Sequence, residues 1–286
     1  MTETDCTRAL GASRYRISPP ASGLPHPALL DRIRESVIGD DALDVAVRLI
    51  DEAEDLLLGT GTLTRLPTAE LIVEGAAYGG FYTPAALDGS RPGVFTATVG
   101  SATELFKIPS VAYHEAVPGH HVQIALAQEL DLPLLRRDAV FTGFAEGWAL
   151  YAERLMSDLG VYEDDPLGDL GRLQLELMRA VRLVVDTGIH DLGWSYDEAV
   201  AYVAENAGES EGLASYRVTR YAVMPAQSTA YMVGLLEILD LREMARDALG
   251  DAFCLAEFHD VILGEGNVPL PLLRELVDAW IAEKRE

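Results

Sequence analysis

The segment YHEAVPGHHVQ (residues 113–123) joins a His-Glu pair to two further histidines across a Pro-Gly step. On a helix, His-Glu-x-x-His presents two histidines to a zinc ion and a glutamate as general base. In this chain the fifth position of that pattern is Pro118. On a regular helix His120 lies roughly 9 Å along the axis from His114 and about 120° around it, and His121 lies about 10 Å along. A regular helix therefore brings neither histidine to a metal ion shared with His114.

A bulge at Pro118 and Gly119 restores the zinc-protease spacing. Proline cannot donate a backbone bond to the carbonyl of His114, and its ring pushes that carbonyl aside, while glycine lets the chain bulge. Without these two residues the segment reads His-Glu-Ala-Val-His. We therefore expect His114 and His120 to bind the metal and Glu115 to act as general base on the attacking water.

Two alternatives stay open for this segment. His121 is the reserve metal ligand if the bulge resolves differently, and otherwise an adjacent hydrogen-bonding or transition-state group. The helix could also simply break at Pro118, which would leave solvated histidines on a loop.

The segment FTGFAEGWALYAERL (residues 141–155) offers a third ligand. Zinc hydrolases with a glutamate ligand place it on a helix roughly twenty to thirty residues past the second histidine, and leave one position open for water. Glu146 lies 26 residues after His120, among small and apolar residues where a carboxylate needs a partner. Glu146 is therefore the predicted third ligand. Glu153, on the same helical face, or Tyr151 is expected to support the ligands by hydrogen bonds.

The charge of the chain disfavours nucleic acid and membranes as partners. The 286 residues include 46 acidic and 22 basic side chains, for a formal charge of -24, which repels phosphate backbones and anionic lipid surfaces. No apolar run reaches the roughly 18 residues of a membrane span, and the N-terminus lacks a basic stretch followed by an apolar core. The two cysteines are too few for a thiolate zinc cluster. We expect a cytoplasmic protein.

Helical patterns dominate the rest of the chain. Prolines at four positions predict an extended arm at 17–27, and glycine, proline and turn residues fill 78–93. Alternation in VFTATV predicts a strand at 94–99. Periodicity predicts helices at 28–39, 41–59, 109–130, 143–159, 168–187, 196–206, 228–248 and 269–284. These elements divide into an N-terminal arm with short helices (1–70) and a catalytic domain (71–286).

Five segments in order resemble a known family. They are ALDGSRPGVF, YHEAVPGHHVQ, GFAEGWALYAE, RLVVDTGIHDLGWS and RYAVMPAQSTAYMVG, which fall within residues 78–240. They are similar to the successive signature segments of the bacterial zincin-like proteins called domain of unknown function 885. Members resemble metallopeptidases and are usually longer, with a large helical N-terminal part. The resemblance implies a mainly α (α+β) fold, in which a small sheet has an edge strand beside the active-site helix.

The resemblance also implies roles for further residues. In zincin-like folds the edge strand holds an extended substrate by backbone bonds, which would involve Thr96 and Ala97. Asp186 and His190 lie four apart on a predicted helix and can share one face, with Asp186 in a supporting role. His190 is expected to orient substrate or stabilise an oxyanion, unless it is a core histidine.

The last segment supplies further candidates and two departures. Arg220, Tyr221 and Tyr231 are candidates to bind a substrate carboxylate or the tetrahedral oxyanion. The family pattern has glycine where this chain has Ala226 and lysine where it has Met232. If that lysine binds a substrate carboxylate in relatives, its loss predicts a different substrate.

The predicted function is a zinc-dependent hydrolase of peptide or amide bonds, with one Zn²⁺ or another divalent metal and a small peptide or small molecule as substrate. A shortened family member recruited to biosynthesis of a small metabolite, doing non-peptidase metal-dependent chemistry, is the alternative that Met232 favours. A non-catalytic binding protein with a relic site is disfavoured, because the four site residues are intact. A homo-oligomer could cover the cleft that the short N-terminal part leaves open.

Overall fold

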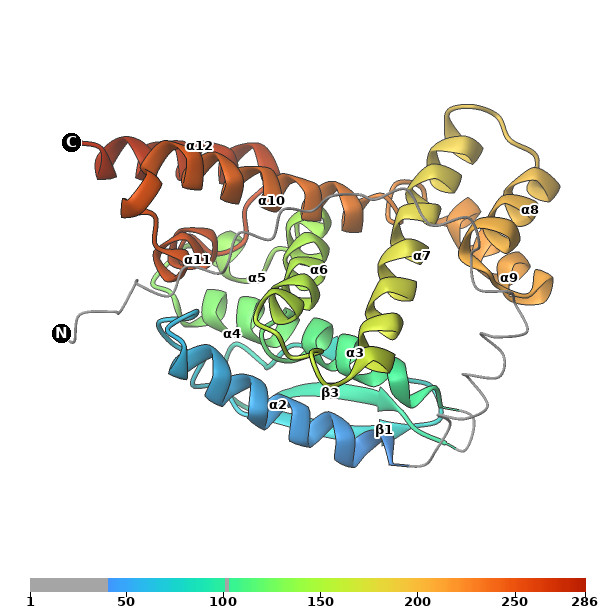
Figure 1. Ribbon diagram of the computed structural model, residues 1–286, viewed down its shortest axis with the longest axis horizontal. Helices are drawn as coiled ribbons and strands as arrows, with labels where there is room; N and C mark the ends of the chain where they lie inside the picture. Colours follow the sequence, from blue (N-terminus) through green and yellow to red (C-terminus); the bar gives the residue numbers. More distant parts are fainter. Residues whose placement is uncertain (1–40, 101–102) are drawn as a thin grey trace.

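The computed structural model describes residues 41–100 and 103–286, and these are mainly helical with a small mixed sheet (Figure 1), which confirms the predicted fold class. The predicted arm at 17–27 and helix at 28–39 lie outside the described residues. In Figure 1, α2 and the sheet lie along one side of the molecule, and α10 and α12 along the opposite side. No helix in the described ranges is long and apolar enough to cross a membrane.

Most of the predicted helices are present, but the helix predicted at 109–130 is divided in two, and the helices at 134–138, 211–223 and 255–264 were not predicted. The helices are α2 (Ala42–Gly59), α3 (Ile108–Glu115), α4 (His120–Glu129), α5 (Leu134–Asp138), α6 (Thr142–Asp158), α7 (Pro166–His190), α8 (Tyr196–Ala207), α9 (Glu211–Val223), α10 (Ala230–Leu249), α11 (Leu255–Gly264) and α12 (Leu270–Lys284). Capping residues mark the start of several of these helices. In α8, Ser195 and Glu198 form a capping box, and the side chain of Asp165 accepts a bond from the backbone of Gly168 at the start of α7.

The sheet corrects one prediction. It contains β1 (Leu71–Ala76), β2 (Phe81–Thr83) and β3 (Gly93–Thr98) in the order β1-β3-β2, so the strand predicted at 94–99 is the central strand and not an edge. β1 pairs with it in parallel and β2 in antiparallel. The carbonyl of Thr96 accepts a bond from Gly80, and Gly79 lies against the backbone of Ala97. The strand therefore lacks the free edge that an extended substrate would need at these residues.

A single large core runs through the main body. It joins α2 to α3, α4, α6, α10, α11 and α12, so residues 42–59 pack with the part of the chain that follows residue 70. A smaller core lies between the second half of α7, α8 and α9. These helices lie together at one end of the molecule (Figure 1). The position of the metal candidates therefore depends on how α3, α4 and α6 pack in the large core.

Glycines allow α6 and α10 to cross with their backbones in contact. A Cβ on Gly234 would lie 1.9 Å from the carbonyl oxygen of Gly143 and 2.6 Å from the Cα of Gly147. We expect Gly234→Ala to lower the free energy of unfolding by about 3 kcal/mol, because the two helices must separate. Gly212→Ala, in a helix with open space around it, is the matched control and should not destabilise. Equal urea-unfolding midpoints for the two variants would contradict this account.

His259 joins three parts of the core through hydrogen bonds. Its Nδ1 donates to the carbonyl of Thr62 at 2.8 Å, and its Nε2 accepts from the hydroxyl of Tyr151 at 2.8 Å. Arg242 donates to the same hydroxyl and pairs with Asp158 at 3.1 Å. The side chain of His259 is fully buried.

Acid should weaken the fold through His259. Burial lowers its pKa from 6.5 to about 4. Below pH 6.5 the unfolded chain therefore binds a proton that the folded chain does not, and stability falls until pH reaches about 4. The difference amounts to about 3 kcal/mol. His259→Gln, which cannot titrate, should show a shallower loss than wild type in urea titrations between these pH values, and parallel curves would refute the prediction.

Candidate metal centre

The segment 116–119 separates the two helices that carry the histidines. α3 ends at Glu115 and α4 begins at His120, so the interruption is four residues long, whereas the sequence predicts two. The indole Nε1 of Trp148 donates to the carbonyl of Pro118 at 2.8 Å, which anchors the segment to α6. A Cβ on Gly119 would lie 1.9 Å from the carbonyl oxygen of His114. Only glycine therefore fits at the closest approach of the segment to α3.

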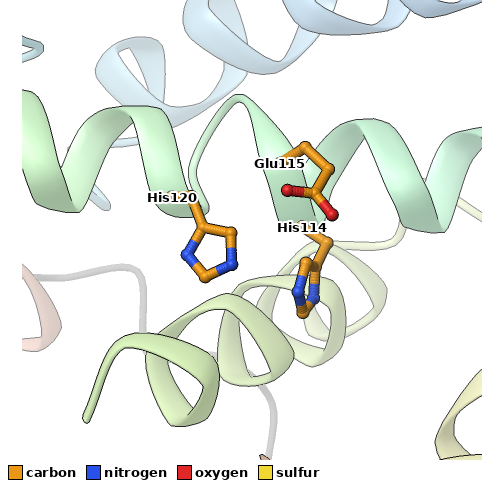
Figure 2. A group of neighbouring side chains, drawn as sticks. All are labelled: His114, Glu115 and His120. Carbon is orange, nitrogen blue, oxygen red and sulfur yellow. The ribbon is translucent and has the colours of Figure 1, made fainter. Parts of the chain in front are cut away.

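His114, Glu115 and His120 converge at this interruption (Figure 2). One ligand atom from each lies within 4.8 Å of the others, so the group could hold a metal ion. The two imidazole rings lie 4.8 Å apart, nearly perpendicular. Glu146, from α6, brings Oε2 to 3.3 Å from Nε2 of His114 and 3.4 Å from Nε2 of His120.

The electrostatics of the group favour a cation. Burial lowers the pKa of His114, but the carboxylates of Glu146 and Glu153 outweigh it and raise that pKa to about 9. Burial raises the pKa of Glu146, yet His114 and His120 hold it well below its usual value. Burial also raises the pKa of Glu115. The carboxylates therefore stabilise a positive charge between the two histidines, whether a proton or a metal ion supplies it.

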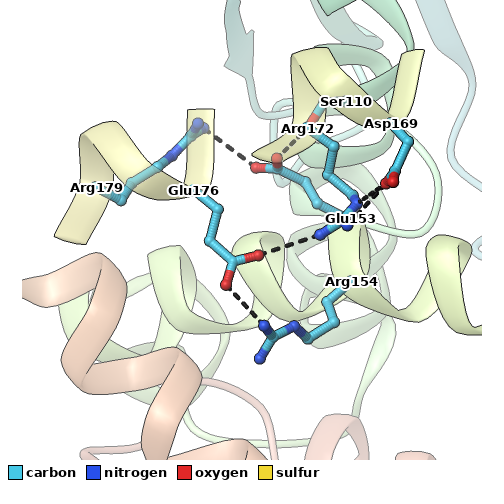
Figure 3. Close-up of polar contacts among 7 residues, drawn as sticks. All are labelled: Ser110, Glu153, Arg154, Asp169, Arg172, Glu176 and Arg179. Atoms are coloured by element: carbon cyan, nitrogen blue, oxygen red, sulfur yellow. Dashed lines mark hydrogen bonds and ion pairs between the residues drawn. The ribbon is translucent and has the colours of Figure 1, made fainter. Parts of the chain in front are cut away.

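Glu153 orients His114 from behind. A carboxylate only accepts hydrogen bonds, so Nδ1 of His114, at 2.7 Å from Glu153, carries the proton and Nε2 is left for a metal. The hydroxyl of Ser110 donates to Glu153, and Arg179 forms an ion pair with the same carboxylate (Figure 3). The ion pair has a length of 3.1 Å. Tyr151, the other residue considered for this support, instead bonds to His259.

Tyr231 lies against the same group. Its ring stacks on that of His114, with centres 6.2 Å apart and planes at 17°. Gln227 donates to its hydroxyl at 3.3 Å, and Arg182 lies over its ring at 3.4 Å from the ring centre. Burial raises the pKa of Tyr231, so its hydroxyl is a hydrogen-bond donor at neutral pH.

The structure does not bring the other candidates to this group. Nδ1 of His121 lies 3.0 Å from the hydroxyl of Tyr82, and the ring lines a separate cavity of about 300 Å³ beside α2 and β1. His190 is exposed, and its Nε2 donates to the carbonyl of Tyr221 at 3.0 Å. The side chain of Tyr221 is buried in the smaller core. Arg220 is exposed on α9.

Asp186 supports the backbone at Ala226 and does not contact the proposed metal ligands. Its Oδ1 accepts a bond at 3.0 Å from the backbone of Ala226, the position where the sequence resemblance implies glycine. Ala226 has φ of 66°, a left-handed conformation that costs a non-glycine residue about 1 kcal/mol. We expect Ala226→Gly to raise the free energy of unfolding by up to about 1 kcal/mol, measured by urea unfolding. A lower midpoint for Ala226→Gly would refute this prediction.

The donor set fits a zinc ion. Two imidazole nitrogens and a carboxylate oxygen are ligands that zinc prefers in catalytic sites. Oε2 of Glu146 is buried without a well-directed hydrogen bond from the described residues, and its near neighbours are the two Nε2 atoms at 3.3 and 3.4 Å. A buried carboxylate oxygen in that state needs a positive partner, which a metal between the two histidines would provide.

The fold and the site together define a mainly helical protein with a small mixed sheet and a largely buried His-Glu-His group that could hold a metal ion. The chain belongs to a family of bacterial proteins of unknown function (DUF885), which matches residues 50–277. The predicted family resemblance is thereby confirmed. No curated protein matches the chain.

Two solved structures share the fold. A candidate lipoprotein from Colwellia psychrerythraea is 39% identical with a TM-score of 0.84, over 90% of this chain and 47% of that one. A candidate lipoprotein of unknown function from Shewanella oneidensis is 24% identical with a TM-score of 0.78, over 87% of this chain and 48% of that one. The chain thus spans about half the length of these relatives, and the second likeness bears on the fold alone.

Arg179 and Arg182 are site residues that the sequence predictions missed. Both are buried on α7. Arg179 pairs with Glu153 and Arg182 lies over Tyr231, and each of these partners contacts His114. Their signal is present in LMRAVRLVV (residues 177–185), where two arginines three apart interrupt an apolar helix. Such residues share one helical face, and charged residues in that setting are seldom buried without a partner.

Proposed function

We propose that the protein is a zinc-dependent hydrolase of peptide or amide bonds, with His114, His120 and Glu146 as the metal ligands. The observation that carries the proposal is the approach of both Nε2 atoms to the same buried Oε2 of Glu146, at 3.3 and 3.4 Å. Bound zinc would supply a Lewis acid that polarises the scissile carbonyl.

Glu115 and Tyr231 have the chemistry that the reaction needs. Glu115 takes a proton from the attacking water, whose oxygen bonds to the carbonyl carbon, and passes that proton to the nitrogen as the C–N bond breaks. Its raised pKa brings it closer to the working pH of such a base. The hydroxyl of Tyr231 can donate to the oxygen that becomes negative. Glu153 holds His114 in the tautomer that binds metal.

Metal content tests the ligand set. Purified wild type is expected to hold one zinc ion per chain by atomic absorption, and His114→Ala and Glu146→Ala to lose it. His190→Ala and Glu243→Ala, at exposed positions, are matched controls for metal retention. Stoichiometric zinc in both ligand variants would overturn the proposed site.

Substrate screening separates the hydrolase from the alternative. Wild type is expected to hydrolyse members of a library of small peptides and N-acyl amino acids. Bound zinc without hydrolysis of any member would favour the recruitment of this site to non-peptidase chemistry.

The location of the protein in the cell is tested by a separate experiment. The sequence predicts the cytoplasm, whereas the two relatives are described as candidate lipoproteins, which favours the cell envelope. Fractionation of cells that express the native gene distinguishes the two locations.

A further inference from the structure

Arg182 is a buried cation that forms no ion pair with a carboxylate in the described part of the chain, although it lies over the ring of Tyr231. Its side chain is 7% exposed, and its Nε and Nη2 are buried without a hydrogen bond. Burial lowers the pKa of Arg182, but a guanidinium stays charged at any working pH. Buried charges in proteins are normally paired, so an unpaired one indicates a ligand that brings the opposite charge.

The guanidinium lies at the edge of the metal centre. Its central carbon is 3.4 Å from the ring centre of Tyr231, and that ring also stacks on His114. Glu146 is among the groups whose charge acts on Arg182. One aromatic ring therefore contacts both the arginine and a proposed metal ligand.

Its neighbour on α7 has a different task. Arg179, one turn earlier, forms an ion pair with Glu153 (Figure 3), with one guanidinium nitrogen 3.1 Å from the carboxylate. It thereby neutralises the carboxylate that orients His114. No carboxylate of the described residues lies within ion-pair distance of Arg182, so its Nε and Nη2 donors are open to a bound molecule.

We propose that Arg182 binds a free carboxylate of the substrate, so that the bond cleaved is the one next to a C-terminal carboxylate, in a small peptide or an N-acyl amino acid. This inference rests on the proposed hydrolase function. One residue spans at most about 3.6 Å. The ring of Tyr231, which Arg182 covers, has its centre 6.2 Å from that of His114, a separation of the order of one or two residues. Forked guanidinium donors match a carboxylate geometrically.

The charge of the protein strengthens the need for this arginine. With a formal charge of -24, the chain repels an anionic substrate at long range. A carboxylate therefore requires a dedicated cation to bind, and a desolvated guanidinium interacts with it more strongly than a surface lysine does. Neutral substrates would gain less from Arg182, because a hydrogen bond to a charged acceptor is the stronger one.

Binding measurements without turnover test the inference. The probes are N-acetyl-L-alanyl-L-alanine and its C-terminal amide, titrated by calorimetry into zinc-loaded Glu115→Gln protein. We expect the acid to bind about tenfold or more tightly than the amide, the effect of one charge-assisted hydrogen bond. Adding Arg182→Gln should abolish the preference, and Arg182→Lys should reduce it to a few-fold because the fork is lost.

The controls separate the possible failures. Arg48→Gln, an exposed arginine on α2, should keep the preference, and thermal unfolding and zinc content check that each variant is folded. Equal binding of acid and amide overturns the inference, as does a preference that survives Arg182→Gln, which would mean that the metal alone holds the acid. If Arg182→Gln does not fold, an unchanged preference in Arg182→Lys overturns it. Failure of wild type to hydrolyse any member of the library, with the preference intact, overturns the hydrolase and the assignment of the cleaved bond but leaves the carboxylate site.

Discussion

Glu115→Gln is expected to lower the hydrolytic rate by about 10³-fold and to leave the zinc content unchanged. Glutamine has the shape of glutamate but cannot take the proton from water. Glu115 lies with His114 and His120 in a group whose ligand atoms are within 4.8 Å of one another, yet Glu146 is the carboxylate that touches both imidazoles. The metal therefore keeps its three proposed ligands when the base is removed.

The measurement is kcat/KM on the best substrate from the screen, with zinc determined on the same preparation. Glu243→Gln makes the same chemical change at an exposed position and should retain wild-type activity. Loss of zinc from Glu115→Gln would show that Glu115 is a ligand, and unchanged activity would show that it is not the base.

The fold could be predicted where local periodicity is strong. Helices predicted at 143–159 and 269–284 correspond to α6 and α12 within one residue at each end, because apolar residues recur at three-and-four spacing. α9 (Glu211–Val223) was missed, since its glycine, serine, threonine and valines are weak helix formers. Tertiary packing in the smaller core stabilises α9.

The order of the strands could not be predicted from local sequence. Alternation identified β3, but its place between β1 and β2 depends on pairing with residues 71–76 and 81–83. An edge strand and a short central strand have the same alternation, and only the partners distinguish them. The expected role of Thr96 and Ala97 depended on that distinction, which explains why the structure corrects it.

Some residues of the site could likewise be predicted from local sequence, and others could not. Spacing alone was enough to nominate His114, His120 and Glu146. In the structure, Oε2 of Glu146 lies within 3.4 Å of Nε2 of both histidines. Arg182 was overlooked because its neighbour across space, Tyr231, is 49 residues away in the chain. Residues that act through such long-range packing leave a weak trace in the sequence, here an arginine in an apolar helix.

Gly119→Ala is expected to cost the protein its tightly bound zinc and about 10²-fold in activity. The added methyl group would lie 1.9 Å from the carbonyl oxygen of His114 and 2.4 Å from that of Tyr113. Side chains essentially never approach closer than 3.0 Å, so the backbone must move by about 1 Å. His114 and His120 flank this contact, and zinc tolerates little change in the positions of its ligands.

Gly59→Ala is the matched control, because a Cβ there meets nothing within 4 Å. It should retain zinc and activity. In Gly119→Ala the helices α3 and α4 are still expected to form, since the contact lies in the segment between them, so far-ultraviolet circular dichroism should stay near that of wild type. Retention of stoichiometric zinc by a folded Gly119→Ala would contradict the account, since His120 would then reach the metal without the close turn that glycine permits.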